Sequence, residues 1–261
     1  MRNKTIGLLG LALVGNFVSG CGSLPSEWSI RPINNSSCLQ GKATMVVPIK
    51  GAPISLQDST FLPFLFGGFV GVAIQEGVDQ PKRAALGTNM AGQASGFCPE
   101  KVLGEECVDL LKRSSWASGK AVTLYKGLET MHGAGPLVER ETRVFKSTLL
   151  KDSDAWKNAY TKWITGGPVH CFKTNEVGPV EFVSLELTGT SVIKGVALTS
   201  GLFLRLMDSV SGKSLASGYA DEEFKVHPLE KPEDLDAFIA DYRRCARHIS
   251  ETLLKKLNLL P

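Results

Sequence analysis

The amino-acid sequence predicts an α+β fold, in which a mixed sheet is backed by a long C-terminal helix, after a removable N-terminal leader. Composition is the first support, because 43% hydrophobic and 21% charged residues over 261 positions are typical of a globular chain with a core. The second is a series of β-branched and apolar segments in the second half of the chain. The third is the stretch 232–260, where apolar residues recur every three or four positions, as on one face of a helix.

The first half of the chain alternates strand and helix patterns. Residues 42–49 (KATMVVPI) predict a strand, and residues 99–113 predict a helix that Gly104 weakens. Residues 121–125 (AVTLY) predict the next strand. Residues 152–164 carry four large apolar side chains on one helical face, which we expect to belong to the core: Trp156, Tyr160, Trp163 and Ile164.

The second half predicts the sheet and its closing helix. Strand patterns occupy residues 180–187, 191–198, 202–207 and 214–219. Because residues 202–207 are apolar at nearly every position, both faces of that strand should be covered. The helix over 232–260 should pack on the sheet through Leu235, Phe238, Ile239, Tyr242, Ala246, Ile249, Leu253, Leu257 and Leu260.

The charge balance gives no support to nucleic-acid binding. The chain has 29 basic and 26 acidic residues, a net charge of +3. Loss of Arg2 and Lys4 with the leader lowers this excess further, to a single charge. A surplus this small does not provide the basic surface with which proteins neutralise phosphates.

Residues 1–20 have the layout of a signal peptide. Arg2 and Lys4 precede an apolar run over residues 6–18. As a helix this run would span about 20 Å, short of the roughly 30 Å hydrocarbon core of a bilayer. We therefore expect cleavage rather than a permanent transmembrane helix.

Residues 18–21 (VSGC) comprise the last three residues of this leader and the cysteine that follows it. They resemble the lipobox of bacterial outer-membrane lipoproteins. The resemblance implies that Cys21 receives a thioether-linked diacylglycerol, that the leader is cut before it, and that its new amino group is acylated by a fatty acid such as palmitate. Two or more chains anchor a protein stably. Gly22 and Ser23 stand where an aspartate would imply retention at the inner membrane, so the resemblance implies the outer membrane, facing the periplasm. The alternative is an ordinary secretory leader, with Cys21 a cysteine of the fold or of a disulfide.

The chain thus divides into three parts. Residues 1–20 are the expected signal peptide, residues 21–40 a lipidated tether, and residues 41–261 a periplasmic α+β domain. Two prolines and an Asn-Asn-Ser-Ser run mark the tether. Within the domain, a mixed and polar stretch at about residues 127–179, with glycine and proline loops, is expected to be an insertion.

Five cysteines remain once Cys21 is assigned to the lipid: Cys38, Cys98, Cys107, Cys171 and Cys245. The periplasm permits disulfides, so at most two bridges are expected. Cys98 and Cys107 are a candidate pair, because a helix starting at Pro99 could carry Cys107 back towards Cys98, although sequence does not fix the connectivity. His170 and Cys171 are adjacent, and neighbours on a strand point to opposite faces, so we expect no metal site there.

Residues 61–74 (FLPFLFGGFVGVAI) contain no charged or strongly polar side chain. At about 21 Å as a helix they are too short to cross a bilayer. We favour a core helix or loop under the sheet. The alternative is a membrane-contacting or oligomer-forming element, whose contact residues would be Phe61, Phe64, Phe66, Gly67, Phe69 and Gly71.

No motif with a catalytic mechanism stands out. Residues 212–214 (GKS) match the end of a phosphate-binding loop but lack its first glycine and its helix, so we interpret them as a hairpin turn. The glycines after His132 are interpreted as a loop, because the chain has no G-x-S-x-G nucleophile elbow. His227 and His248 lack carboxylates at a recognisable catalytic spacing. We therefore expect neither an enzyme nor a cofactor.

Residues 202–219 (LFLRLMDSVSGKSLASGY) resemble a hairpin of several envelope lipoproteins, in which a strand, an aspartate, small residues and Gly-Lys precede a second strand. These are the curli-secretion lipoprotein, the transport-auxiliary lipoproteins and, more distantly, the amino-terminal domain of TolB. Their order of elements is similar to residues 99–125 followed by 180–260. The resemblance implies a mixed α/β adaptor domain without a cofactor.

Three functions are consistent with these observations. The first is a non-catalytic, lipid-anchored accessory for envelope assembly, secretion or transport, which binds an envelope protein. The second is a membrane-perturbing or pore-forming oligomer that acts through residues 61–74. The third is a periplasmic hydrolase or small-ligand binder, which would need a pocket lined by convergent polar groups.

Overall fold

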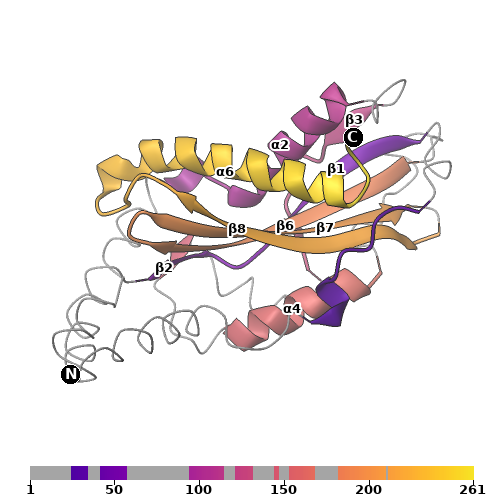
Figure 1. Ribbon diagram of the computed structural model, residues 1–261, viewed down its shortest axis with the longest axis horizontal. Helices are drawn as coiled ribbons and strands as arrows, with labels where there is room; N and C mark the ends of the chain where they lie inside the picture. Colours follow the sequence, from indigo (N-terminus) through magenta and orange to yellow (C-terminus); the bar gives the residue numbers. More distant parts are fainter. Residues whose placement is uncertain are drawn as a thin grey trace, which may run out of the picture.

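A computed structural model describes residues 25–34, 42–57, 94–114, 121–131, 144–146, 153–167, 182–209 and 211–261. Its elements form three layers (Figure 1). Helices α2 and α6 lie on one face of a mixed sheet, and helix α4 with the short helix η1 lies on the other. In chain order the elements are η1 (Ser26–Trp28), β1 (Ala43–Lys50), β2 (Ile54–Gln57), η3 (Ala94–Gly96), α2 (Pro99–Arg113), β3 (Val122–Leu124), β4 (Glu129–Thr130), β5 (Phe145–Lys146), α4 (Ser153–Thr165), β6 (Phe182–Lys194), β7 (Ala197–Asp208), β8 (Ser214–Lys225), η6 (Pro232–Asp234) and α6 (Leu235–Lys256).

The long strand β6 lies at the centre of the sheet. On one side it pairs antiparallel with β7 along its whole length, and β7 pairs antiparallel with β8. On the other side it pairs in parallel with β1 over its first half and with β2 over its last residues. The short strands β3 and β4 extend the sheet beyond β1, and β5 extends it beyond β2. The predicted mixed sheet with a C-terminal helix is therefore confirmed.

The first core layer lies between the sheet and helices α2 and α6. Most of the apolar stripe predicted over 232–260 is buried, including Phe238, Tyr242, Ile249 and Leu253, and Ile239 and Leu260 are partly buried against the same cluster. Opposite it, β6 and β7 direct Leu185, Leu187, Leu202, Leu204 and Leu206 into the same cluster. This layer supplies most of the buried apolar surface, the main stabilising contribution to a fold of this size.

The second core layer lies between the sheet and α4. Trp156, Tyr160, Trp163 and Ile164 are all buried there, so the prediction that this helical face belongs to the core is confirmed. The ring of Phe203 on β7 stacks on Tyr160 at 4.6 Å and meets Trp28 edge-on at 4.7 Å. With both layers in place β7 is covered on both faces, as its continuous apolar sequence predicts.

The N-terminal segment 25–34 packs on the domain, which corrects the prediction that the tether extends through residue 40. Trp28 and Ile33 are only 9% and 6% exposed, and they belong to the second and first core layers, respectively. Between them Arg31 forms an antiparallel bridge with Ser217 at the edge of β8. The physical reason is the hydrophobic effect. Burial of the Trp28 and Ile33 side chains is favourable, and an extended tether would leave both of them in water.

The strands are longer than the sequence patterns indicate. Residues 180–198 were predicted to hold two strands, but β6 runs unbroken to Lys194 and turns at Gly195, whose φ of +58° favours glycine. Strand β7 therefore begins before Leu202, and β8 continues past Tyr219 through an acidic run. Charged side chains are compatible with an edge strand because they remain in water.

Candidate functional site

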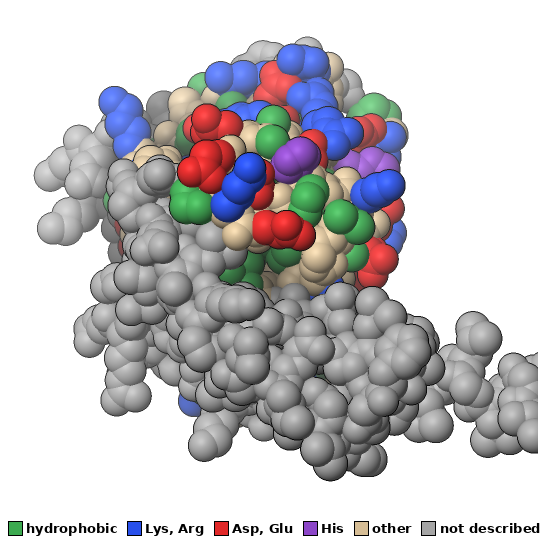
Figure 2. Space-filling model, turned by 90° about the vertical axis from the view of Figure 1, so that its left-hand side faces the viewer, with side chains coloured by type: hydrophobic (Ala, Val, Ile, Leu, Met, Phe, Trp, Pro, Cys, Tyr) green, Lys and Arg blue, Asp and Glu red, His purple; other side chains and the backbone are tan. Residues whose placement is uncertain are grey.

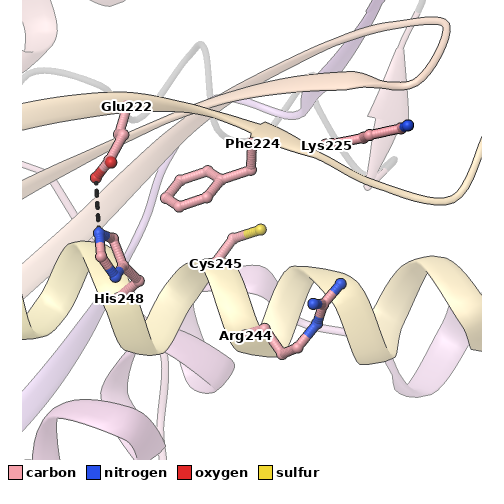
Figure 3. Close-up of a pocket in the computed structure, with 6 residues that line it drawn as sticks. All are labelled: Glu222, Phe224, Lys225, Arg244, Cys245 and His248. Atoms are coloured by element: carbon pink, nitrogen blue, oxygen red, sulfur yellow. Dashed lines mark ion pairs between the residues drawn. The ribbon is translucent and has the colours of Figure 1, made fainter.

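A shallow hollow lies between the edge strand β8 and helix α6 (Figure 3). Its volume is about 290 Å³, and it is open to solvent. Because side chains alternate along a strand, Glu222 and Phe224 both point from β8 towards α6. The residues that line the hollow are Glu222, Phe224, Lys225, Arg244, Cys245 and His248.

His248 and Glu222 join the two walls of the hollow. Nε2 of His248 lies 3.2 Å from Oε2 of Glu222 (Figure 3). The His248 ring also meets the ring of Phe224 edge-on, with centroids 5.8 Å apart. Both members of the ion pair are about half exposed, so the pair contributes little to stability. The pair places an imidazole ring next to an apolar ring in an accessible hollow.

Arg244 is held by a second ion pair. Its guanidinium lies 2.6 Å from Oδ1 of Asp241, whose Oδ2 accepts a hydrogen bond of 2.6 Å from the backbone N–H of His227. Partial burial alone would raise the pKa of Asp241, but the hydrogen bonds from His227 and Arg244 outweigh it and lower the pKa. The carboxylate therefore stays charged and ties the segment after β8 to α6.

The surface near the hollow carries both signs of charge. Figure 2 shows acidic, basic and histidine side chains interspersed over the described part of one face. Helices α2 and α6 are joined by ion pairs: Arg243 lies 2.8 Å from Glu105, and Arg247 lies 2.8 Å from Asp109. In the part of the chain that the structure describes, Lys225 has no carboxylate partner, and its side chain extends away from the other five in Figure 3.

The described cysteines are free thiols with raised pKa values. Burial raises the pKa of Cys98 and of Cys245 to about 11, and that of Cys107 to about 12. At neutral pH all three are therefore protonated, and a thiol is a much weaker nucleophile than a thiolate. Cys245, which lines the hollow, does not have the character of an activated cysteine.

The candidate disulfide between Cys98 and Cys107 is wrong. Both thiols are free, because helix α2 begins at Pro99 and carries Cys107 away from Cys98. Nine helical positions correspond to a rise of about 13 Å. The two Cα atoms of a disulfide lie no more than about 7 Å apart.

A second polar centre, which sequence reasoning missed, lies buried under α4. Arg205 of β7 and Glu186 of β6 are both 0% exposed, and Nη2 of Arg205 lies 2.7 Å from Oε2 of Glu186. The guanidinium also lies over the ring of Trp163 at 4.8 Å, and the indole N–H of Trp163 donates to the same carboxylate oxygen at 3.3 Å. Burial lowers the pKa of Arg205 and the charge of Glu186 acts against this, so the guanidinium remains protonated.

Arg205 also completes the C-terminal end of α4. Its Nη1 donates to the carbonyl oxygens of Trp163 and, at 2.9 Å, of Gly166, and its Nη2 donates to Gly167 at 2.8 Å. The last carbonyl groups of a helix have no partner within the helix. One buried side chain therefore fixes both the sheet register and the position of α4, which is a structural role.

A third polar centre holds the corner between β1 and β2. The backbone N–H of Gly51 donates to Oε1 of Glu100 at 2.9 Å, and Cys98 donates to Oε2 at 3.4 Å. Tyr160 accepts from the N–H of Ala52 at 2.8 Å. A Cβ atom at residue 51 would lie only 2.6 Å from the backbone oxygen of Gly189, so the corner requires glycine. Burial raises the pKa of Glu100, because this carboxyl group is shielded from water.

Several residues singled out from the sequence lie outside the described residues. They include the lipidation candidate Cys21 and all six contact candidates in the run 61–74: Phe61, Phe64, Phe66, Gly67, Phe69 and Gly71. They also include Cys38, His132, His170 and Cys171. Within the described ranges, no group of three or more His, Cys, Asp or Glu side chains is placed to hold a metal ion. No described helix is long and apolar enough to cross a membrane.

No protein-family model and no curated protein matches this chain. Among solved structures, it is similar to the hypothetical protein CT253 from Chlamydia trachomatis. That similarity has 8% sequence identity and a TM-score of 0.32, and it covers 83% of this chain and 98% of the other.

Proposed function

We propose that this protein is a lipid-anchored accessory protein of the bacterial envelope, which works through contact with another envelope protein and not through catalysis. The observation that carries the proposal is the lipobox-like sequence VSGC at residues 18–21, directly after a charged start and a short apolar run. A thioether at Cys21 and an acylated amino group would supply enough acyl chains for stable anchoring. Gly22 and Ser23 favour the outer membrane, with the domain facing the periplasm.

The packing of the N-terminal segment supports this reading. Residues 22–24 alone separate Cys21 from Pro25, and four steps of extended chain span at most about 14 Å. From Pro25 onward the chain is fixed to the domain through Trp28, Arg31 and Ile33. A lipid on Cys21 would therefore hold the folded body close to the bilayer surface.

The chemistry of the hollow supports contact as the mode of action. Its thiol, Cys245, is protonated at neutral pH, and three of its polar groups, Glu222, Arg244 and His248, are engaged in ion pairs. The hollow is shallow and open, whereas a site for a small substrate usually encloses most of its ligand. The exposed walls of the hollow, formed by β8 and α6, are suited to contact with the surface of another protein.

Replacing Cys21 with serine tests the anchor. Wild-type protein should be cleaved before Cys21, carry the added lipid mass in intact-mass analysis and fractionate with outer membranes. The variant Cys21→Ser should accumulate as a precursor or lose the membrane fraction. Cys98→Ser is the matched control, since its hydroxyl can still donate to Glu100 and Cys21 is intact. A wild-type protein with a bare thiol at Cys21, or with the leader still attached, would overturn the proposal.

Photo-crosslinking in intact envelopes tests the contact. A crosslinking amino acid at Glu222, at the rim of the hollow, should give one reproducible adduct whose partner is identified by mass spectrometry. The same group at Lys256, an exposed position at the end of α6, serves as the control. Turnover of ester or phosphate substrates by the purified protein, abolished by His248→Ala, would replace this proposal with an enzymatic one.

A further inference from the structure

The outer edge of β8 already accepts one extended residue. The N–H of Arg31 donates to the carbonyl oxygen of Ser217 at 2.7 Å, and the N–H of Ser217 donates to that of Arg31 at 3.0 Å. Because backbone groups in an antiparallel ladder point to alternate sides, Tyr219, Asp221 and Glu223 direct theirs to the same outer edge as Ser217. On its inner side this stretch pairs with β7, and beyond the Arg31 bridge no residue of the described ranges pairs with its outer edge.

Two side chains of this stretch, Asp221 and Glu223, are acidic and lie on one face of the strand. Tyr219 packs against the second core layer. Asp221 and Glu223 follow it at every second position, so they lie on the same face further along the strand. Their neighbours across the ladder on β7 are Gly201 and Thr199, which bring no cation. Both carboxylates are exposed, and neither has an ion pair with any described residue.

We propose that Tyr219 to Glu223 of β8 accept an extended basic segment of the partner protein as an added antiparallel strand. Backbone hydrogen bonds would provide the pairing, and Lys or Arg side chains at alternate positions would lie beside Asp221 and Glu223. This inference rests on the proposed accessory function and names the chemistry of its partner.

Charge selects this occupant over others. An edge strand with adjacent acidic side chains resists pairing with neutral or acidic strands, but it attracts a basic one. A second copy of this chain, paired through the same stretch, would place the carboxylates of Asp221, Glu222 and Glu223 opposite one another, which is destabilising. The hollow beside the strand offers Phe224 as an apolar surface for the alternate side chains of a guest strand.

The test uses the full lipidated chain in neutral detergent and a fluorescent nine-residue peptide with lysine and valine at alternate positions. Fluorescence anisotropy should show saturable binding, and a twin peptide with glutamate in place of lysine should not bind. Asp221→Lys with Glu223→Lys should weaken binding of the lysine peptide at least about fivefold, because two cross-strand charge pairs become repulsive. The same double variant should gain binding of the glutamate peptide.

The matched control reverses the same amount of charge away from the edge, at Glu230 and Glu233. Glu230→Lys with Glu233→Lys should leave binding of the lysine peptide unchanged. Hydrogen exchange supplies an independent measurement: on binding, the amides of Asp221 and Glu223 should become protected, while the amide of Glu222, already bonded to β7, should not change.

Three results would overturn this inference. The first is an equal loss of lysine-peptide binding in the Asp221→Lys/Glu223→Lys variant and in the Glu230→Lys/Glu233→Lys control. The second is peptide binding without protection of the Asp221 and Glu223 amides. The third is self-association of the chain that protects the same amides. Each would leave the lipid anchor and the crosslinked partner in place, so failure here is distinguishable from failure of the accessory function.

Discussion

Replacing Arg205 with methionine should destabilise the fold strongly. Arg205 is fully buried and pairs with Glu186, which is also fully buried. It also supplies the hydrogen-bond donors for the carbonyl oxygens at the end of α4. Methionine has a comparable length and keeps the apolar contacts, but it removes every donor and the positive charge.

The expected magnitude follows from the two groups left without a partner. Removing one member of a buried ion pair costs about 3–5 kcal/mol, because the other charge remains buried. The carbonyl oxygens add roughly 1 kcal/mol, since Gly167 is exposed and water can replace part of the lost donor. We expect Arg205→Met to lower the free energy of unfolding by about 4–6 kcal/mol. Adding Glu186→Met should restore part of this loss, because it removes the orphaned carboxylate.

Urea unfolding, followed by tryptophan fluorescence, measures these differences. Lys255→Met is the control, because it removes an exposed ion pair of 2.9 Å with Glu251, and its effect should stay within about 0.5 kcal/mol. A loss below about 1 kcal/mol for Arg205→Met would refute the reasoning. So would a double variant no more stable than the single one.

Three further predictions concern the packed N-terminal segment and the buried titratable groups. Burial raises the pKa of Glu100 above 4.5, so as the pH rises the unfolded chain loses the proton of this carboxyl group at a lower pH than the folded chain does. The free energy of unfolding of the wild type should therefore fall as the pH rises from 4.5 through the folded pKa. Glu100→Gln should lack this pH dependence when stability is measured by urea titration at several pH values. Trp28→Ala should cost about 3 kcal/mol and expose residues 25–34 to limited proteolysis, whereas resistance equal to the wild type would show that this segment is not held by the indole. At pH 8, Cys98, Cys107 and Cys245 should react slowly with a thiol reagent when folded and quickly in urea, and a Cys98–Cys107 crosslink in peptide maps would contradict the free thiols.

The spacing of apolar residues predicted the helices well, because the apolar face of each helix can be recognised within its own segment of sequence. The stripe of α6 and the four aromatic and aliphatic residues of α4 needed no knowledge of the partner surface. The parallel pairing of β1 with β6, in contrast, joins segments far apart in the chain, and nothing within either segment specifies the other. The short strands β4 and β5 also depend on their neighbours, since two residues carry no detectable pattern.

The buried ion pair had a local signal that the sequence reasoning did not use. With the hairpin turn at Gly195 and Val196, residues equally distant from the turn face each other, and Glu186 and Arg205 each lie nine positions away. Two opposite charges at matching positions, with only uncharged residues between each of them and the turn apart from Lys194, predict a cross-strand pair. The ion pair between His248 and Glu222 had no such signal, because it depends on how α6 is placed across β8.

The proposed anchor and the proposed docking edge are linked by one short stretch of chain. Arg31 pairs with Ser217, and the proposed docking stretch begins two residues further along β8, at Tyr219. Ten Cα-to-Cα steps lead from Cys21 to Arg31, so even a fully extended chain would span no more than about 35 Å. A lipid on Cys21 would therefore keep the edge of β8 near the bilayer, where a basic segment of a membrane-attached partner has a high effective concentration. Under that constraint, modest backbone and charge-pair contacts at Asp221 and Glu223 would be sufficient for recognition, and a large apolar interface would not be required.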